Sequence, residues 1–199
     1  MNETIEKMRR NAQSYRERLE EIRRDWTLSE EAKRQDLEAA YSEARGTHAR
    51  LAEEFRSEVK ERLQTTRKAA FSAPKVGKDA ALDMFVYRDA LAKVSSTTDQ
   101  RTLSEMLDRA EMTGDHSLAR AVLYRGYELQ SEHLVGSYLE KYPDERPAWD
   151  AFMGAAQEHN TLEKLGISGA VGVPEPQRPQ ELGRQFAYSS QPESAGEGT

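Results

Sequence analysis

Apolar side chains recur at alternating steps of three and four residues through the first part of the chain. This spacing places them along one stripe of an α-helix, at the a and d positions of a heptad repeat. A first series spans residues 5–26 and a second spans residues 37–55, with Trp26 as the last member of the first series. The predicted seam residues are Ile5, Met8, Ala12, Tyr15, Leu19, Ile22, Leu37, Tyr41, Ala44, His48, Leu51 and Phe55.

The stretch DWTLSEEAKRQDL, residues 25–37, separates the two series and predicts a corner near residues 26–30. Thr27 and Glu30 have the spacing of a capping box, in which each side chain accepts the other residue's amide. Ser29 is an equally suitable N-cap for a helix that begins at Glu30. A helix therefore ends before this stretch and another begins within it.

A chain that folds back at this corner brings together residues whose numbers sum to 56, such as Ala12 and Ala44. Every a residue then meets a d residue, as antiparallel packing requires. We predict an antiparallel coiled-coil hairpin over residues 1–70 on this basis. One continuous rod that dimerises in parallel is the alternative, because neither Gly nor Pro stands at the corner.

Residues 76–165 predict a bundle of four to five helices, since no segment alternates with the period of two that strands require. The first predicted helix carries a stripe of apolar residues on or near one face. Thr98 or Asp99 caps the second helix, and Gly114 ends it as a C-terminal glycine. The stripe of the first helix consists of Leu82, Phe85 and Val86, followed by Asp89 and Val94.

Asp115 caps a third predicted helix, which extends as far as Leu139 in its longest version, and Pro143 marks its end. A last helix carries Trp149, which we expect to be an anchor of the core. The segment LDRAEMTGDHSLARAVLYRGYE, around Gly114, resembles the helix–turn–helix unit of tetratricopeptide-like repeats. That resemblance implies antiparallel helix pairs.

Residues 166–199 are dominated by Pro, Gly, Ser, Gln and Glu, so they offer little apolar surface to offset the cost of ordering. We predict a disordered tail over this range. One apolar cluster in it, Leu182, Phe186 and Tyr188, is either a chance grouping or a docking motif that orders on a partner.

Charge and composition narrow the function classes. Residues 1–68 contain 16 Lys and Arg against 15 Asp and Glu, and the whole chain has a net charge of −6, which argues against a general nucleic-acid binder. Cysteine is absent, so disulfides, thiolate metal sites and cysteine nucleophiles are excluded. No apolar stretch approaches the length of a membrane span. We expect a soluble intracellular protein.

No motif in the chain carries a recognisable chemistry. The four histidines lack the spacing of a metal site, and a single imidazole in a seam, His48, is typical of a hydrogen-bonded core residue. The glycines at 166, 169 and 172 do not follow a strand, so they fail the context of a phosphate-binding loop. Asp108, Glu111 and Asp115 are typical of an exposed acidic face. The prediction is a non-enzyme without catalytic residues, metal or cofactor.

Residues 28–34, with the pattern L-S-x-E-x-K-R, and the following EAAYSEAR resemble the opening of small uncharacterised proteins of actinobacterial phages and prophages. The resemblance covers about the first 65 residues and implies a structural or virion-assembly setting. It also implies a location in the cytoplasm of a bacterial host or in a virion. The expected function is therefore assembly through coiled-coil association, with self-association or virion proteins as partners, and capsid scaffolding as one version. The alternative is a host-directed regulatory or adaptor protein that binds another protein, or DNA through the arginine column at Arg9, Arg16 and Arg23.

Overall fold

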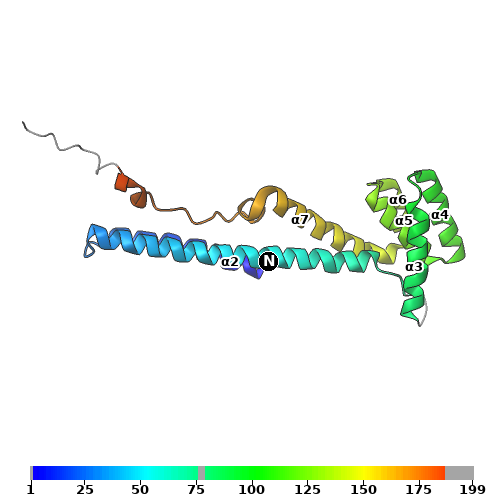
Figure 1. Ribbon diagram of the computed structural model, residues 1–199, viewed down its shortest axis with the longest axis horizontal. Coiled ribbons are helices and arrows are strands. Elements are labelled where there is room, and N and C mark those ends of the chain that lie inside the picture. Colours follow the sequence, from blue (N-terminus) through cyan, green and yellow to red (C-terminus); the bar gives the residue numbers. More distant parts are fainter. Residues whose placement is uncertain (1, 76–78, 187–199) are drawn as a thin grey trace, which may run out of the picture. The chain divides into compact units, whose positions relative to one another are not determined.

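The computed structural model describes residues 2–75 and 79–186, and all regular structure within these residues is helical, which confirms the all-α prediction (Figure 1). Contacts divide the chain into two compact units. We call residues 1–59 with 160–199 the hairpin unit and residues 60–159 the bundle unit. The elements in chain order are α1 (Glu3–Arg24), α2 (Glu30–Phe71), α3 (Ala80–Ser95), α4 (Gln100–Thr113), α5 (His116–Glu128), α6 (Glu132–Lys141), the 3-10 turn η1 (Pro143–Glu145), α7 (Arg146–Val171) and the 3-10 turn η2 (Gln180–Phe186).

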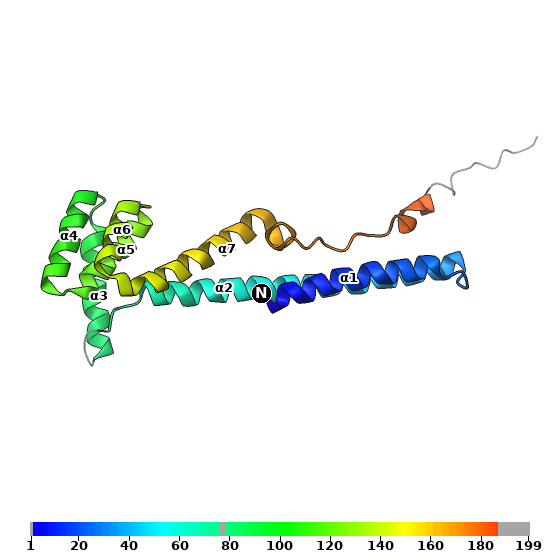
Figure 2. The same ribbon diagram turned by 180° about the vertical axis from the view of Figure 1, so that it is seen from behind.

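Helices α1 and α2 of the hairpin unit run antiparallel, side by side (Figures 1 and 2). The Thr4 hydroxyl donates to Glu58 at 2.6 Å, and the Asn11 amide donates to the Ala44 carbonyl at 3.0 Å. Rising numbers on α1 thus meet falling numbers on α2. The Asn11–Ala44 contact lies near the predicted register and the Thr4–Glu58 contact is offset from it, so the register stays a prediction. The chain folds back, so the continuous rod is not the arrangement found here. Supercoiled knobs-into-holes packing stays a prediction.

The corner between α1 and α2 is built differently from a capping box. The Ser29 hydroxyl accepts the Ala32 amide at 3.2 Å and therefore caps α2. Thr27 donates both its amide, at 2.8 Å, and its hydroxyl, at 2.6 Å, to the Asp25 carboxylate. The capping-box prediction for Thr27 is wrong because Asp25 already engages that residue, and the Ser29 alternative is right. Trp26 is 89% exposed, so it does not extend the seam.

The bundle unit is organised around α5, which packs against α3, α4 and α6. Local signals set its helix ends as predicted. The Asp99 side chain caps α4, Gly114 ends that helix in the left-handed region at φ 68°, and Asp115 caps α5. The core holds these buried apolar residues: Ala70, Phe71, Tyr87, Ala90, Val94, Leu103, Leu107, Ala110, Ala119, Ala121, Val122, Leu123, Leu134, Tyr138, Leu139 and Phe152.

Two predictions for the bundle helices need correction. The long third helix is wrong: α5 ends at Glu128, Gln130 adopts a positive φ of 54°, and Ser131 caps α6. The apolar stripe predicted for α3 is also not the buried face over the first half of the helix. Tyr87, Ala90 and Val94 are the buried residues, whereas the stripe that begins at Leu82 faces solvent.

The division into units differs from the predicted domain boundaries at both ends. Helix α2 continues past residue 59, and its last residues, Ala70 and Phe71, belong to the bundle core. Helix α7 likewise continues past 159, and Leu162 joins a core cluster of the hairpin unit. Helices α2 and α7 each contribute residues to the cores of both units. The boundaries between the units therefore lie inside these helices and not at a helix end.

The predicted disorder from residue 166 onward is wrong for residues 166–183. Gly166 interrupts α7 at φ 66° and ψ −179°, a conformation that favours glycine, and the helix then resumes to Val171. Ile167 and Val173 are buried with Met8 and Phe55 in a core cluster of the hairpin unit. The tail could order because its few apolar residues meet an existing hairpin surface. Tyr188 lies outside the described residues.

Candidate functional site

The predicted association seam is occupied within the chain itself. Nine of its residues are buried and the other three are half-buried. One cluster contains Tyr15, Leu19, Ile22, Leu37 and Ala44, with Tyr41 packed against it. A second contains Met8, Leu51 and Phe55, with Ile5 and Ala12 packed against it. These side chains stabilise the hairpin, and a partner that used them would have to separate α1 from α2.

His48 is the exception to the apolar character of the seam. It is 4% exposed, and neither ring nitrogen has a hydrogen-bond partner within the described residues. The expectation of a core histidine holds for its burial but not for its hydrogen bonding. A buried polar group without a partner costs about 1–3 kcal/mol.

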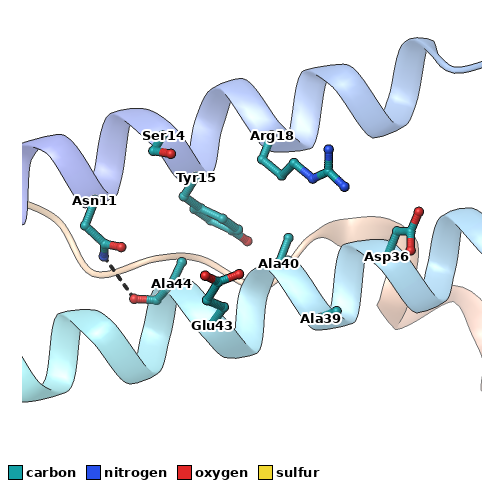
Figure 3. Close-up of a pocket in the computed structure, with 9 residues that line it drawn as sticks. All are labelled: Asn11, Ser14, Tyr15, Arg18, Asp36, Ala39, Ala40, Glu43 and Ala44. Carbon is teal, nitrogen blue, oxygen red and sulfur yellow. Dashed lines mark hydrogen bonds between the residues drawn. The ribbon is translucent and has the colours of Figure 1, made fainter.

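A pocket of about 290 Å³ opens between α1 and α2 beside Tyr15 (Figure 3). Asn11 and Arg18 line it from α1, and Asp36 and Glu43 line it from α2. The Tyr15 ring lies between the two helices, and small residues, Ala39, Ala40 and Ala44, leave the space open. Its charged lining offers neither a nucleophile paired with a base nor a group of metal-ligating residues.

Residues 172–183, which we call the strap, bind to the side of the hairpin. The Tyr15 hydroxyl donates to the Gln177 carbonyl at 2.7 Å, and burial raises the pKa of the Tyr15 phenol. Arg23 donates to both carboxylate oxygens of Glu181, at 2.7 and 3.3 Å. These contacts join the strap to α1.

The strap also contacts α2, where Arg178 forms an ion pair with Glu38 at 3.1 Å. Leu182 packs against the cluster around Tyr15, so this member of the predicted docking motif meets the chain's own hairpin. Phe186 is the last residue of η2. The sequence held one signal for the strap: the buried residues Val173, Pro176 and Pro179 recur every three residues, the repeat of a polyproline II helix.

The exposed apolar residues of α3 form the clearest unoccupied surface of the bundle unit. Leu82 is 59% exposed, Phe85 is 71% exposed, and Val86 is also exposed. Their i, i+3, i+4 spacing places them on one face of the helix, and we call them the α3 stripe. Three neighbouring exposed apolar side chains make this helix face a candidate interaction surface.

A groove of about 650 Å³ lies in the bundle unit between the α5–α6 corner and α7. Its apolar wall consists of Tyr127, Val135, Trp149 and Met153. Its lining also includes Glu128 and Glu132. The sequence predicted Trp149 as a core anchor, and the structure places it half-buried at the edge of the core, where it also lines this groove.

Arg120 is a buried charge that the sequence did not single out. Its guanidinium forms an ion pair with Glu145 and donates to the Ser72 carbonyl at 3.2 Å. It therefore ties α5 to the segment after α2 and to η1. Tyr87 lies in the same core, donates to the Phe71 carbonyl at 2.8 Å, and has its pKa raised to about 12 by burial. Both groups serve packing rather than an open site.

The acidic residues considered as a cation site have partners of their own. Lys141 contacts Asp108 at 3.2 Å and also pairs with Glu111, while Asp115 accepts the Leu118 amide at 2.9 Å as the cap of α5. Within residues 2–75 and 79–186, no group of three or more His, Cys, Asp or Glu side chains could hold a metal ion. No helix in this part of the chain is long and apolar enough to cross a membrane.

Comparisons with known proteins identify no relative whose function could be assigned to these surfaces. No protein-family model, no curated protein and no solved structure matches the chain.

Proposed function

We propose that this chain is a non-enzymatic protein that works by associating with other proteins, in the setting of phage or prophage virion assembly. The observation that carries the proposal is the α3 stripe, Leu82, Phe85 and Val86, which faces solvent on a helix whose opposite face is buried. Burial of an aromatic and two aliphatic side chains supplies several kcal/mol toward a contact. Such a helix face fits against an apolar surface of a partner.

The seam of the hairpin has a supporting part in this proposal. Its residues pack within the chain, so association through a second coiled-coil partner would compete with α1. We therefore assign the contact to the α3 stripe and treat the hairpin as a stabilised arm. This departs from the expectation of association through the heptads.

Light scattering coupled to size-exclusion chromatography tests the proposal. The wild type should exceed its monomer mass of 22.6 kDa as concentration rises, or should form a complex with purified portal or capsid protein. The double substitution Leu82→Ser and Phe85→Ser should abolish that gain, because it removes the apolar contact. Met112→Ser is the matched control, since Met112 is 82% exposed and lies on another helix, α4. A strict 22.6 kDa species that binds neither virion protein would contradict the proposal.

A regulatory or adaptor protein that binds one other protein is the alternative, because the same stripe would serve a partner of different sequence. The DNA-binding version has weaker support. Arg9 pairs with Glu6 at 2.6 Å, and Arg23 pairs with Glu20 at 3.0 Å and with Glu181. Duplex binding that weakens steeply with salt would favour it nonetheless.

A further inference from the structure

Two ion pairs of opposite polarity hold residues 177–182, which we call the outer strap, on the hairpin. Arg23 of α1 pairs with Glu181 of the strap at 2.7 Å. Glu38 of α2 pairs with Arg178 of the strap at 3.1 Å. A strap that lay in the opposite direction would bring like charges together, so the two pairs fix the direction of the outer strap on the hairpin.

Both ion pairs are exposed to solvent, where dissolved salt weakens them. The four charged side chains are between 39% and 59% exposed. Ion pairs with this exposure contribute little to stability and are screened as the salt concentration rises. Arg23 also pairs with Glu20 of its own helix at 3.0 Å, so release of Glu181 leaves the Arg23 guanidinium with a partner. The outer strap can thus leave the hairpin at a small electrostatic cost.

The other contacts of the outer strap with the hairpin combine a hydrogen bond with apolar packing. The Tyr15 hydroxyl donates to the Gln177 carbonyl at 2.7 Å. Leu182 is half-buried and packs against the cluster around Tyr15, and Pro179 is buried. The Leu182 amide donates within the strap, to the Pro179 carbonyl at 3.1 Å, so separation from the hairpin leaves this hydrogen bond intact.

The inner end of the strap is anchored in a different way. Val173 is 2% exposed and packs in the core cluster that contains Met8 and Phe55. It directly follows Gly172, which has a positive φ of 66° at the end of α7. Screening by salt does not weaken an apolar contact, because such a contact involves no charge. A rise in ionic strength should therefore act on the outer strap and leave the Val173 anchor in place.

We propose that the outer strap is a charge-locked clasp, which opens from the hairpin as the ionic strength rises while Val173 stays packed. Opening uncovers Tyr15 and the part of its cluster against which Leu182 packs. The open clasp thus exposes apolar hairpin surface that the closed clasp keeps from water. This device uses no residue of the α3 stripe, so it goes beyond the proposed function and does not depend on it.

Thiol labelling of the full chain tests the clasp, since the chain has no cysteine of its own. Leu182→Cys places a thiol in the outer strap, and Val173→Cys places one in the anchor. Met112→Cys, at an exposed position of α4, reports the reactivity of the reagent itself. N-ethylmaleimide should label position 182 about threefold faster when NaCl is raised from about 50 mM to about 1 M, because the Debye length falls to about 3 Å. The labelling rates at positions 173 and 112 should stay constant.

A charge exchange in the Leu182→Cys background separates the ion pair from the apolar packing. Arg178→Glu should raise the labelling rate about threefold, because it places a second carboxylate beside Glu38. Glu38→Arg should do the same by placing two guanidinium groups together. The two substitutions combined restore an ion pair of reversed polarity, so the labelling rate should return to that of Leu182→Cys alone.

Three results would overturn the proposal. The first is a labelling rate at position 182 that responds neither to salt nor to the charge substitutions. The second is a combined charge exchange that labels as fast as the single substitutions. The third is an equal acceleration at positions 173 and 182, because the strap would then open together with the core of the hairpin unit and not as a clasp.

Discussion

At the scale of single residues, His48 is the costliest feature of the hairpin. Its ring is 4% exposed, and both nitrogens lack partners among the described residues. We predict that His48→Leu raises the free energy of unfolding by about 1 kcal/mol, because an apolar side chain of similar size removes an unsatisfied polar group. Urea unfolding measures the change. Arg50→Leu, an exposed change on the same helix, should leave stability nearly unchanged. A loss of stability in His48→Leu would show that the imidazole has a partner, such as water.

Tyr87 gives the bundle unit a dependence on alkaline pH. Its hydroxyl donates to the Phe71 carbonyl at 2.8 Å, and burial raises its pKa to about 12, above the ~10 of an exposed phenol. The folded state holds this proton more tightly than the unfolded state. The contribution of the protonated Tyr87 phenol to the free energy of unfolding is therefore fully present below about pH 10 and is lost as the pH rises toward 12.

We predict that Tyr87→Phe lowers the free energy of unfolding by about 1 kcal/mol at neutral pH, through loss of the hydrogen bond. The difference in unfolding free energy between the two proteins should narrow when the pH is raised from about 10 toward 12. In that range the Tyr87 phenol of the wild type releases its proton on unfolding, which favours the unfolded state, and the Phe variant has no such proton. Urea titrations across that range measure both effects. A difference that stays constant with pH would contradict the account of Tyr87.

At the scale of elements, the sequence predicted helix ends well where a side chain or a glycine encodes them locally. Gly114 and Asp115 mark the end of α4 and the start of α5 in both the sequence and the structure. The α5–α6 break was missed because Gln130 carries no local signal for its positive φ. Tertiary packing accounts for the break: a Cβ at Gly126 would lie 3.0 Å from the Cβ of Leu134, so α6 packs closely against α5.

Gly166 is the element-scale feature that ends the straight part of α7. Its φ of 66° and ψ of −179° lie in a region that is essentially restricted to glycine. We predict that Gly166→Ala destabilises the protein by about 1–3 kcal/mol through backbone strain. Gly154→Ala is the matched control in the same helix. Its Cβ would meet nothing within 4 Å, so it should stabilise by about 0.5–1 kcal/mol. Thermal unfolding of both variants checks the sign of each stability change. Equal changes for the two variants would contradict the positive φ at Gly166.

At the scale of the whole molecule, composition proved a poor guide to where order ends. The strap is rich in Pro, Gly and Glu, yet Val173 is buried and Tyr15, Arg23 and Glu38 contact residues 177–181. Composition reports how much apolar surface a segment itself contains. It does not report the apolar surface of another element against which the segment can pack. The same limit explains the α3 stripe, since helical periodicity identifies an apolar face without saying whether anything covers it.

Val173 tests whether the strap belongs to the hairpin unit. We predict that Val173→Ala costs about 2 kcal/mol of unfolding free energy, the value of a buried valine side chain. Glu175→Ala, two residues away and exposed, should have little effect. Chemical denaturation followed by circular dichroism measures both. A neutral Val173→Ala would support the disordered tail that the composition suggested.

The central claim is that the α3 stripe is covered when the protein is associated. The chain has no cysteine, so Asp89→Cys introduces a single thiol beside Phe85 and Val86 without altering the stripe. The account predicts that its maleimide labelling slows several-fold when protein concentration is raised or a virion partner is added, while Met112→Cys on α4 labels at a constant rate. A labelling rate at position 89 that stays unchanged under every condition, while the molar mass increases, would contradict the claim.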